Sequence, residues 1–366
     1  MSTIVLMAGG TGGHLFPAMA LAQELRRRGH VIHLMTDHRA TGYGDRFPAE
    51  QTHIVPSATP SVRDPVKFVL AGTKIVWGIG IALGKLSGIK VDAVVGFGGY
   101  PVYPPFVAAS LIGLPGVLHE QNAVLGRSNR ALAKRARVLA LSFAKTLKAE
   151  PFADKSLLVG NPVRDRVRAI ADTPYPALVA GDPIQILVTG GSQGARVFSD
   201  IVPAAVAELP ADLRGRLRIT QQCRPEDLDR VAESYRQAEI NVELAAFFDD
   251  LPERMAQSHL VICRSGASTV AELTVIGRPA VLVPLPGSID ADQKNNALFV
   301  DAAGGGWVAE QATLSPHSLG TRLAALLSDP AGLQRAAAAA KSLGQPDAVE
   351  KLADVAEALA SKGKPK

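Results

Sequence analysis

The feature that most constrains the fold is a glycine-rich turn that occurs twice, each time between an apolar strand and a helix. Residues 4–8 are apolar and lead into GGTGG at residues 9–13, after which apolar residues recur with the spacing of a helix. Residues 184–189 lead in the same way into GGSQG at residues 190–194. A strand that passes through a tight turn into a helix opens a doubly wound parallel sheet. The chain is therefore predicted to begin such a sheet twice.

The length of 366 residues exceeds the roughly 250 to 300 residues at which one hydrophobic core stops growing, so two domains are expected. Further apolar runs that we expect to be strands are residues 31–35, 93–96, 116–119, 138–141, 157–159, 217–220, 242–245, 260–263 and 280–284. Residues 172–183 are rich in Pro, Ala and Asp, as connectors often are. We therefore predict an α/β chain of two Rossmann-like, doubly wound domains, residues 1–163 and 164–340, that face each other across a cleft. The Ala-rich stretch at residues 331–362 is predicted to be helical and could pack on either domain, with packing of its end, about residues 341–366, on the first domain as one possibility.

Composition narrows the class of partner. The net charge of +5 and the pI near 9.2 favour anionic partners, whereas an aromatic content of 5% argues against a platform that stacks nucleic-acid bases, so no nucleic-acid partner is expected. The two cysteines, Cys223 and Cys263, have neither metal-type spacing nor a histidine motif beside them, so no disulfide framework and no zinc site are expected. The apolar run near the N-terminus has no basic segment before it and is interpreted as a strand rather than a signal peptide.

The glycine turns lie where a parallel sheet binds anions with the free N–H groups of a helix N-terminus. The first turn lacks the third glycine of a dinucleotide fingerprint, because Leu15 occupies that position, which disfavours a nicotinamide enzyme. Neither turn ends in Gly-Lys-Ser/Thr, which disfavours a P-loop NTPase. A turn that binds no ligand is the structural alternative for each.

Two further patterns allow other chemistry. Residues 190–194 match G-x-S-x-G, so Ser192 could be the nucleophile of a serine hydrolase, although the only later histidines, His259 and His317, do not lie in an obvious triad position. Asp290 and Asp292 could hold a divalent metal, but we interpret them as turn aspartates. A non-catalytic nucleotide-sugar-binding module is the other alternative function.

His14 directly follows the first glycine turn, where an imidazole could take a proton at neutral pH. The structural alternative is a first-turn histidine that binds only backbone.

Residues 67–85 form an apolar segment with a tryptophan and flanking lysines. The part between Lys74 and Lys85 is too short to span a bilayer, so the segment is interpreted as lying on a membrane surface, with an ordinary buried helix as an equal alternative. A second basic cluster suited to acidic headgroups consists of Arg127, Arg130, Lys134, Arg135 and Arg137.

Six motifs together resemble one known family over nearly the whole chain. They are GGTGGH at residues 9–14, GFGGYP at 96–101, HEQN at 119–122, GNPVR at 160–164, GGSQGA at 190–195, and CRSGA at 263–267 with Glu272. They resemble the MurG family, the bacterial N-acetylglucosaminyltransferases that convert the first lipid-linked peptidoglycan precursor into the second.

This resemblance implies a GT-B fold and an inverting transfer of N-acetylglucosamine from UDP-GlcNAc to the 4-hydroxyl of muramic acid in undecaprenyl-pyrophosphoryl-MurNAc-pentapeptide. It implies no metal and no other cofactor. The expected location is the cytoplasmic face of the bacterial inner membrane, against an anionic lipid surface, with cell-wall synthesis proteins as further partners.

The resemblance also assigns site residues. His14 is the candidate base, Glu272 would bind the ribose hydroxyls, and the acceptor would lie against Gly98, Gly99 and Tyr100. The expected donor contacts are Thr11, Gly12, Gly13, Asn122, Arg164, Ser192, Phe248, Ala267, Ser268, Thr269, Val270, Ala271, Glu272 and Gln293. Residues 57–64 depart from the family pattern, which leaves the acceptor contacts of that loop open, and Phe248 stands where an aliphatic residue is frequent.

Overall fold

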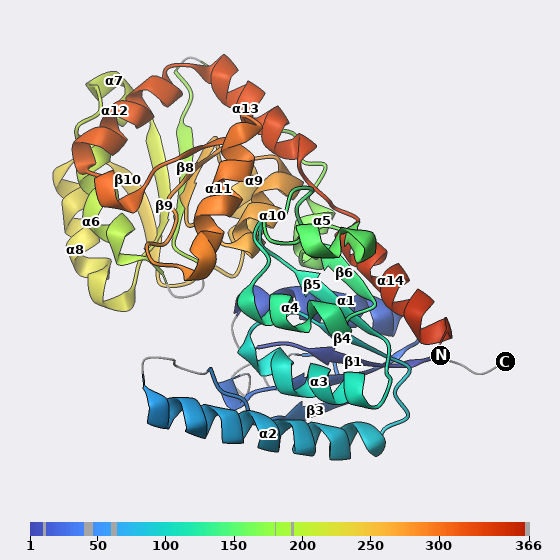
Figure 1. The fold of residues 1–366 in the computed structure, drawn as a ribbon. Coiled ribbons are helices and arrows are strands. Elements are labelled where there is room, and N and C mark those ends of the chain that lie inside the picture. The colour runs from blue at the N-terminus through green and yellow to red at the C-terminus, as the bar shows by residue number, and fades with distance from the viewer. Residues whose placement is uncertain (10–11, 40–46, 60–63, 180, 192–193, 363–366) are drawn as a thin grey trace. The chain divides into compact units, whose positions relative to one another are not determined.

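The computed structural model describes residues 1–9, 12–39, 47–59, 64–179, 181–191 and 194–362. It divides into two compact units (Figure 1). Unit 1 comprises Met1–Arg164 together with Pro346–Lys366, and unit 2 comprises Asp165–Gln345. Thr11 and Ser192, two of the predicted donor contacts, lie outside the described residues.

Unit 1 is built on a seven-stranded parallel sheet with the order β3-β2-β1-β4-β5-β6-β7. Its strands are β1 (Thr3–Met7), β2 (Val31–Thr36), β3 (Gln51–Ile54), β4 (Ala93–Gly96), β5 (Gly116–Glu120), β6 (Val138–Leu141) and β7 (Ser156–Leu158). The central strands are apolar at almost every position because helices cover both faces of the sheet. The strand order reverses between β1 and β4, the kind of position at which doubly wound sheets bind ligands.

Two apolar clusters cover the two faces of this sheet. The helices of unit 1 are α1 (Gly12–Arg27), α2 (Pro65–Ser87), α3 (Tyr103–Leu111), α4 (Arg127–Leu132) and α14 (Ala348–Lys362), with short 3-10 turns at Tyr100–Val102, Ala133–Arg135 and Glu150–Lys155. One cluster joins the sheet to α1 and α14, and the other joins it to α2, α3 and α4 (Figure 1). Both faces are thereby withdrawn from water.

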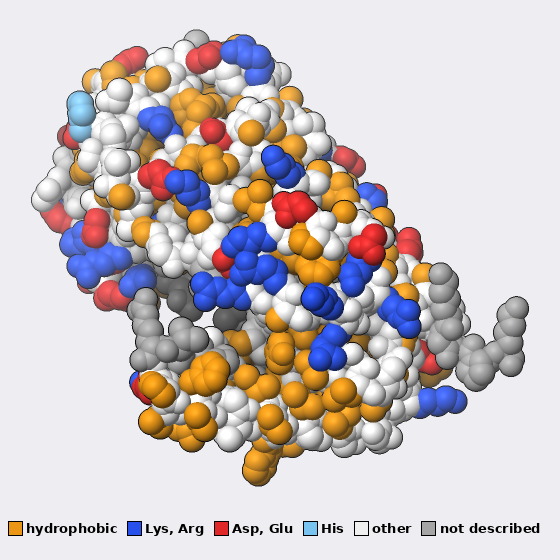
Figure 2. Space-filling model, in the orientation of Figure 1, with side chains coloured by type: hydrophobic (Ala, Val, Ile, Leu, Met, Phe, Trp, Pro, Cys, Tyr) orange, Lys and Arg blue, Asp and Glu red, His pale blue; other side chains and the backbone are white. Residues whose placement is uncertain are grey.

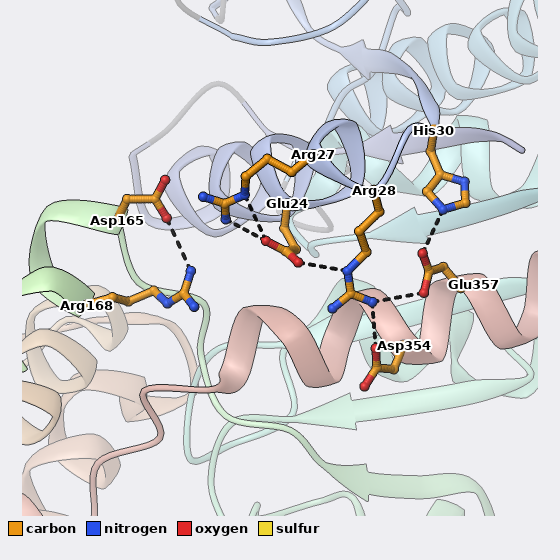
Figure 3. A network of polar contacts seen from close by, with 8 residues as sticks. All are labelled: Glu24, Arg27, Arg28, His30, Asp165, Arg168, Asp354 and Glu357. Carbon is orange, nitrogen blue, oxygen red and sulfur yellow. Dashed lines mark hydrogen bonds and ion pairs between the residues drawn. The ribbon is translucent and has the colours of Figure 1, made fainter. Parts of the chain in front are cut away.

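The C-terminal helix α14 packs against α1 within unit 1. Its Leu352 and Ala356 are fully buried in the cluster that contains Leu15 and Leu25 of α1. At the rim of this contact Arg28 Nη1 lies 2.6 Å from Asp354 Oδ1 and 2.9 Å from Glu357 Oε2, and His30 Nε2 lies 2.7 Å from Glu357 Oε1 (Figure 3). The tail is not one continuous helix, because α13 (Pro330–Ser342) ends before Gly344 and Pro346 and α14 begins after them. The last helix therefore completes the first sheet's core.

Helix α2 is attached to unit 1 along one narrow stripe. Its buried residues are Ala71, Gly78, Ala82 and Leu86, which recur at helical spacing on one face. Gly78 is required there, because a Cβ would lie 2.0 Å from the carbonyl oxygen of Pro56. The exposed large hydrophobic side chains of the helix are Val66, Phe68, Val69, Leu70, Val76 and Trp77.

The interpretation of α2 as an ordinary buried helix is therefore wrong. Figure 2 shows hydrophobic side chains gathered along the lower edge of the view, where Figure 1 draws α2. The helix also runs well beyond Lys74, and by length and composition alone its 23 residues would suffice to cross a membrane. Along its buried stripe the helix packs against α3 and Pro56 of unit 1.

Unit 2 repeats the topology with six parallel strands in the order β10-β9-β8-β11-β12-β13. The strands are β8 (Ile184–Thr189), β9 (Leu217–Gln222), β10 (Asn241–Ala245), β11 (Leu260–Cys263), β12 (Ala280–Leu282) and β13 (Gly306–Val308). The remaining helices are α5 (Asp165–Ala169), α6 (Arg196–Ala207), α7 (Ala211–Arg214), α8 (Leu228–Gln237), α9 (Leu251–Gln257), α10 (Ala267–Ile276), α11 (Asp292–Ala302) and α12 (Pro316–Leu327). The order again reverses after the first strand, between β8 and β11, so both halves of the chain build the same kind of sheet.

Candidate active site

In unit 1 three loops meet at the carboxyl edge of the sheet beside the reversal of strand order. They follow β1, β4 and β5, which are neighbours in the sheet and parallel. The first leads into α1, the second carries Gly98 and Gly99, and the third begins with Gln121. Loops from adjacent parallel strands meet at the same edge, so residues far apart in sequence come together here.

His14 lies in the first turn of α1 between the first two of these loops. Its Nδ1 is 3.0 Å from Oε1 of Gln121, so the ring is held by a side chain from the third loop. The opposite edge of the ring lies beside the β4 loop, because a Cβ on Gly99 would lie 3.3 Å from both Cδ2 and Nε2 of His14. The ring therefore has Nδ1 held by Gln121 and its Cδ2–Nε2 edge beside Gly99.

Gln121 is held in turn by a buried histidine. Its Nε2 lies 2.9 Å from His119 Nδ1 and 3.1 Å from the carbonyl oxygen of His119. His119 Nε2 lies 2.9 Å from the carbonyl oxygen of Gly160. Burial lowers the pKa of His119 to about 4, so this imidazole is neutral at neutral pH.

The loop after β5 is organised by the buried carboxyl group of Glu120. Its two oxygens accept hydrogen bonds from the backbone N–H groups of Asn122 and Gly126, at 3.1 and 2.9 Å, and from the side-chain amides of Asn122 and Asn129, at 3.2 and 2.8 Å. Burial raises the pKa of Glu120, and these donors oppose the rise. The carboxyl group thereby fixes Asn122, a predicted donor contact, next to Gln121.

The predicted acceptor residues form a turn that only glycine fits well. Gly98 and Gly99 both have φ of +76°, the left-handed region that other residues rarely adopt. Tyr100 follows, and its hydroxyl donates to Asp37 Oδ2 at 3.1 Å while the Arg39 guanidinium lies 4.8 Å from its ring centroid. Burial and Asp37 raise the pKa of the Tyr100 phenol, so it stays a donor. The turn and its tyrosine form one fixed surface beside His14.

The remaining predicted donor contacts of unit 1 are Arg164, at the end of the unit, and the glycines at the start of α1. The guanidinium of Arg164 lies 5.9 Å from the ring centroid of Phe16, two residues after His14 on α1. Asn161 is 5% exposed, and neither its Oδ1 nor its Nδ2 has a hydrogen-bond partner among the described residues. Gly12 and Gly13, the other predicted donor contacts of this unit, begin α1 itself.

In unit 2 the second glycine turn follows β8. Gly191 and Gly194 have φ of +80° and +66°. A Cβ on Gly190 would lie 2.2 Å from the backbone nitrogen of Ala195, so the turn can close only around glycine. The hydroxyl of Thr189 donates to Gln222 Oε1 at 2.9 Å, which ties the end of β8 to that of β9.

The N-terminus of α10 lies at the same edge, because β11 is the neighbour of β8. The helix begins at Ala267 after Gly266, which makes no side-chain capping bond, so its first N–H groups have no helical partner. Ser268 Oγ is buried without a hydrogen-bond partner in the described part of the chain. Glu272, only 8% exposed, lies one turn further along. The five predicted residues from Ala267 to Ala271 and Glu272 thus share a single helix start, which is suited to an anion or a polar ligand.

Gln293 and Phe248 lie on other elements of unit 2. Gln293 is in the first turn of α11, where its Oε1 accepts from the backbone N–H of Leu285 at 3.0 Å and its carbonyl oxygen accepts from the Ser265 hydroxyl at 2.8 Å. Phe248 is buried and packs under the Arg254 guanidinium, 4.5 Å from the ring centroid. Gln293 is therefore connected to the loop before α10, whereas Phe248 is fixed by packing.

The alternative of a serine hydrolase finds no support in the positions of the later histidines. His259 immediately precedes β11, and its Nδ1 accepts from the backbone N–H of Gln185 at the beginning of β8, 2.9 Å away. It therefore lies at the amino edge of the sheet, opposite the carboxyl edge at which β8 ends. His317 is exposed and pairs with Glu208.

Asp292, which follows β12, has a structural role. Asp292 Oδ1 accepts from the backbone N–H of Gln293 at the start of α11, as a turn or cap residue does. Within the described ranges no group of three or more His, Cys, Asp or Glu side chains is arranged to hold a metal ion.

The residues that organise the site were not among the predicted contacts. Gln121, His119, Glu120 and Asn129 connect the loops of unit 1, and Ser265 connects two elements of unit 2. A signal was present for the first three, since polar residues directly after a buried strand mark the carboxyl edge of a parallel sheet. No local pattern marks Asn129 or Ser265.

Comparisons with known proteins agree over the whole chain. Residues 4–151 match the glycosyltransferase family 28 N-terminal domain, and residues 185–352 match its C-terminal domain. A Rhizobium etli protein named UDP-N-acetylglucosamine–N-acetylmuramyl-(pentapeptide) pyrophosphoryl-undecaprenol N-acetylglucosamine transferase is 48% identical over 358 residues, 98% of this chain and 96% of its own length. A protein of the same name from Chelativorans sp. is 50% identical over 359 residues, again 98% of this chain and 96% of its own.

Solved structures give the same result. The crystal structure of Acinetobacter baumannii MurG matches with a TM-score of 0.82 at 28% identity, over 98% of this chain and 100% of that one. The glycosyltransferase of kitacinnamycin matches with a TM-score of 0.72 at 19% identity, over 98% and 99%, and supports the fold alone.

Two doubly wound parallel sheets, each with a glycine turn at its reversal of strand order, and matches to both family 28 domains define a glycosyltransferase of the GT-B type. The predicted fold class and the predicted enzyme class are thus confirmed. The chain belongs to the MurG family, as its relatives over 98% of its length establish.

Proposed function

We propose that this chain transfers N-acetylglucosamine from UDP-GlcNAc to the 4-hydroxyl of the muramic acid in undecaprenyl-pyrophosphoryl-MurNAc-pentapeptide, with inversion at the anomeric carbon. The names of relatives with 48 to 50% identity support the donor and the acceptor. The observation that carries the chemistry is the His14 ring, with Nδ1 held by Gln121 and Nε2 on the edge that lies beside Gly99.

In the proposed reaction His14 Nε2 accepts the proton of the acceptor hydroxyl. The oxygen attacks the anomeric carbon and forms the new glycosidic bond. The bond from that carbon to the diphosphate breaks, and its electron pair leaves with UDP. A base must lie within hydrogen-bond reach of the hydroxyl, and the turn of Gly98, Gly99 and Tyr100 is the surface against which the acceptor would be held.

The negative charge that grows on the diphosphate would be stabilised by residues proposed for the donor. In unit 2 these are Ser192 and the free N–H groups at the start of α10, where the helix dipole also favours an anion. In unit 1, Arg164 supplies a cation, and Gly12 and Gly13 at the start of α1 would let the backbone come close. Glu272 would accept hydrogen bonds from the ribose hydroxyls, and Gln293 would bind the sugar. These groups would let the reaction proceed without a divalent metal.

We further propose that α2 holds the enzyme on the cytoplasmic face of the inner membrane. The long apolar acceptor named for the relatives is a membrane lipid, and the exposed hydrophobic residues of α2 offer a surface for the bilayer. Lys67 and Lys74, both exposed, lie on the same helix and suit anionic headgroups. Other cell-wall synthesis proteins would meet the enzyme at that membrane.

The proposal is tested by incubating the full chain with radiolabelled UDP-GlcNAc and the lipid-linked muramyl pentapeptide in the presence of a chelator. The expected result is release of UDP together with a labelled disaccharide lipid. Product that forms only after addition of a divalent metal would refute the metal-free chemistry. UDP release without a labelled lipid would refute the acceptor assignment.

A further inference from the structure

We propose that Gln121 and His119 are positioning residues that fix the tautomer of His14, so that Nδ1 carries the proton and Nε2 offers its lone pair to the acceptor. The proposal deepens the proposed function, since it concerns the base of that reaction. It follows from four hydrogen bonds in unit 1, whose directions are set by two backbone carbonyl groups.

The first fixed point is the carbonyl oxygen of Gly160. It lies 2.9 Å from His119 Nε2, and a carbonyl oxygen can only accept. His119 Nε2 must therefore carry the proton. Because this imidazole is neutral, its Nδ1 has a lone pair and acts as an acceptor.

The second fixed point is the carbonyl oxygen of His119, which lies 3.1 Å from one end of the Gln121 amide. That end must be the NH₂ group, which decides the orientation of the amide without reference to any other contact. The same NH₂ group donates to His119 Nδ1 at 2.9 Å, in agreement with the first step. The Gln121 carbonyl oxygen therefore faces His14.

The tautomer of His14 follows from these two steps. Gln121 Oε1 can only accept, so His14 Nδ1, 3.0 Å away, must donate. In a neutral ring the lone pair is then on Nε2, which belongs to the ring edge beside Gly99. Free histidine prefers the opposite tautomer, with the proton on Nε2, which could not accept a proton on the side of the acceptor.

The same arrangement fits the product of proton transfer. When Nε2 has taken the proton, Nδ1 still donates to Gln121 Oε1, so no partner has to move. An amide in this position is uncharged, in contrast to the carboxylate that holds the histidine of a serine protease triad. Gln121 therefore orients the base without adding a charge beside it.

The tautomer can be measured directly by nitrogen NMR on the full chain labelled with ¹⁵N-histidine, because protonated and unprotonated ring nitrogens differ strongly in chemical shift. His14 is expected as the Nδ1–H tautomer. His259 supplies a reference for the Nε2–H tautomer in the same spectrum, since its Nδ1 accepts from the backbone N–H of Gln185 at 2.9 Å. A His14 signal of the same type as that of His259 would overturn the proposal.

Gln121→Met removes the amide while keeping the length of the side chain. We expect the His14 signal to move toward the Nε2–H tautomer, kcat to fall about 10- to 100-fold and the KM for UDP-GlcNAc to change less than about twofold. Unchanged signals of His33, His53 and His259 establish that the variant is folded. An unchanged His14 tautomer in that folded variant contradicts the role of Gln121.

Gln121→Glu provides a second test, which distinguishes a positioning role of Gln121 from a merely structural one. A carboxylate still accepts from His14 Nδ1–H, and its charge favours the protonated ring, so the acidic limb of the kcat/KM profile should move to higher pH. A lower rate with an unmoved limb would overturn the proposal. A His14→Ala enzyme with full turnover would instead refute the base in the proposed function, whereas the tautomers of His14 and His119 are measured by NMR independently of turnover.

Discussion

Trp77 on α2 gives the most direct test of membrane attachment. Its side chain is 66% exposed, and a tryptophan has about 250 Å² of surface, so about 165 Å² is open to solvent. Complete transfer of this area from water at about 25 cal/mol/Å² would contribute about 4 kcal/mol. A helix that lies at the interface buries about half of it, so Trp77→Ala should lose about 2 kcal/mol, which corresponds to roughly 30-fold weaker partitioning.

The assay is co-sedimentation of the full chain with vesicles that contain anionic lipid. Phe247→Ala is the matched control, because Phe247 is an aromatic residue of unit 2 that is 64% exposed and does not belong to α2. The control should bind as the unchanged chain does. If Trp77→Ala binds within twofold of the unchanged chain, the assignment of α2 to the membrane surface is refuted.

Three further predictions concern chemistry, donor binding and pH. His14→Ala should lower kcat about 10²- to 10⁴-fold with little change in UDP-GlcNAc affinity by calorimetry, and loss of affinity alone would contradict its role as base. Glu272→Ala should weaken UDP-GlcNAc binding in the same calorimeter, whereas an effect on acceptor affinity alone would contradict its assignment to ribose. Burial lowers the pKa values of His53 and His119 from 6.5 to about 4, so between those values the unfolded chain binds protons that the folded chain does not. The free energy of unfolding should therefore fall as the pH is lowered from about 6.5 to about 4, and denaturant titrations with no such fall would contradict the burial of these rings.

Periodicity and glycine turns were sufficient to predict most of the sheet, because strands buried on both faces are long apolar runs. The strands that were missed are short and carry little of that signal. β3 reads QTHI at the sheet edge, with one buried residue, and β13 is the three-residue segment GWV. Their pairing with β2 and β12 depends on the neighbouring strand rather than on their own composition.

The candidate site was predictable in its loops but not in its connections. The turn before His14 follows from the strand–glycine–helix pattern and the role of Gly99 from the family resemblance, whereas the contact between His14 and Gln121 joins residues 107 positions apart. Such a contact depends on the order of β1, β4 and β5 in the sheet. The exposure of α2 could likewise not be predicted from the sequence, because an apolar helix has the same composition whether it faces a protein core or a lipid.

The return of the chain from unit 2 to α14 has a consequence for biosynthesis. Leu352 and Ala356 belong to the same core as residues of β1 and α1, so the amino-terminal half lacks part of its interior until the final segment has left the ribosome. Residues 1–164 therefore remain incompletely packed while unit 2 is translated. A stop codon near residue 345 would thus destabilise unit 1, which is translated first, although the residues of α14 that it deletes are translated after unit 2.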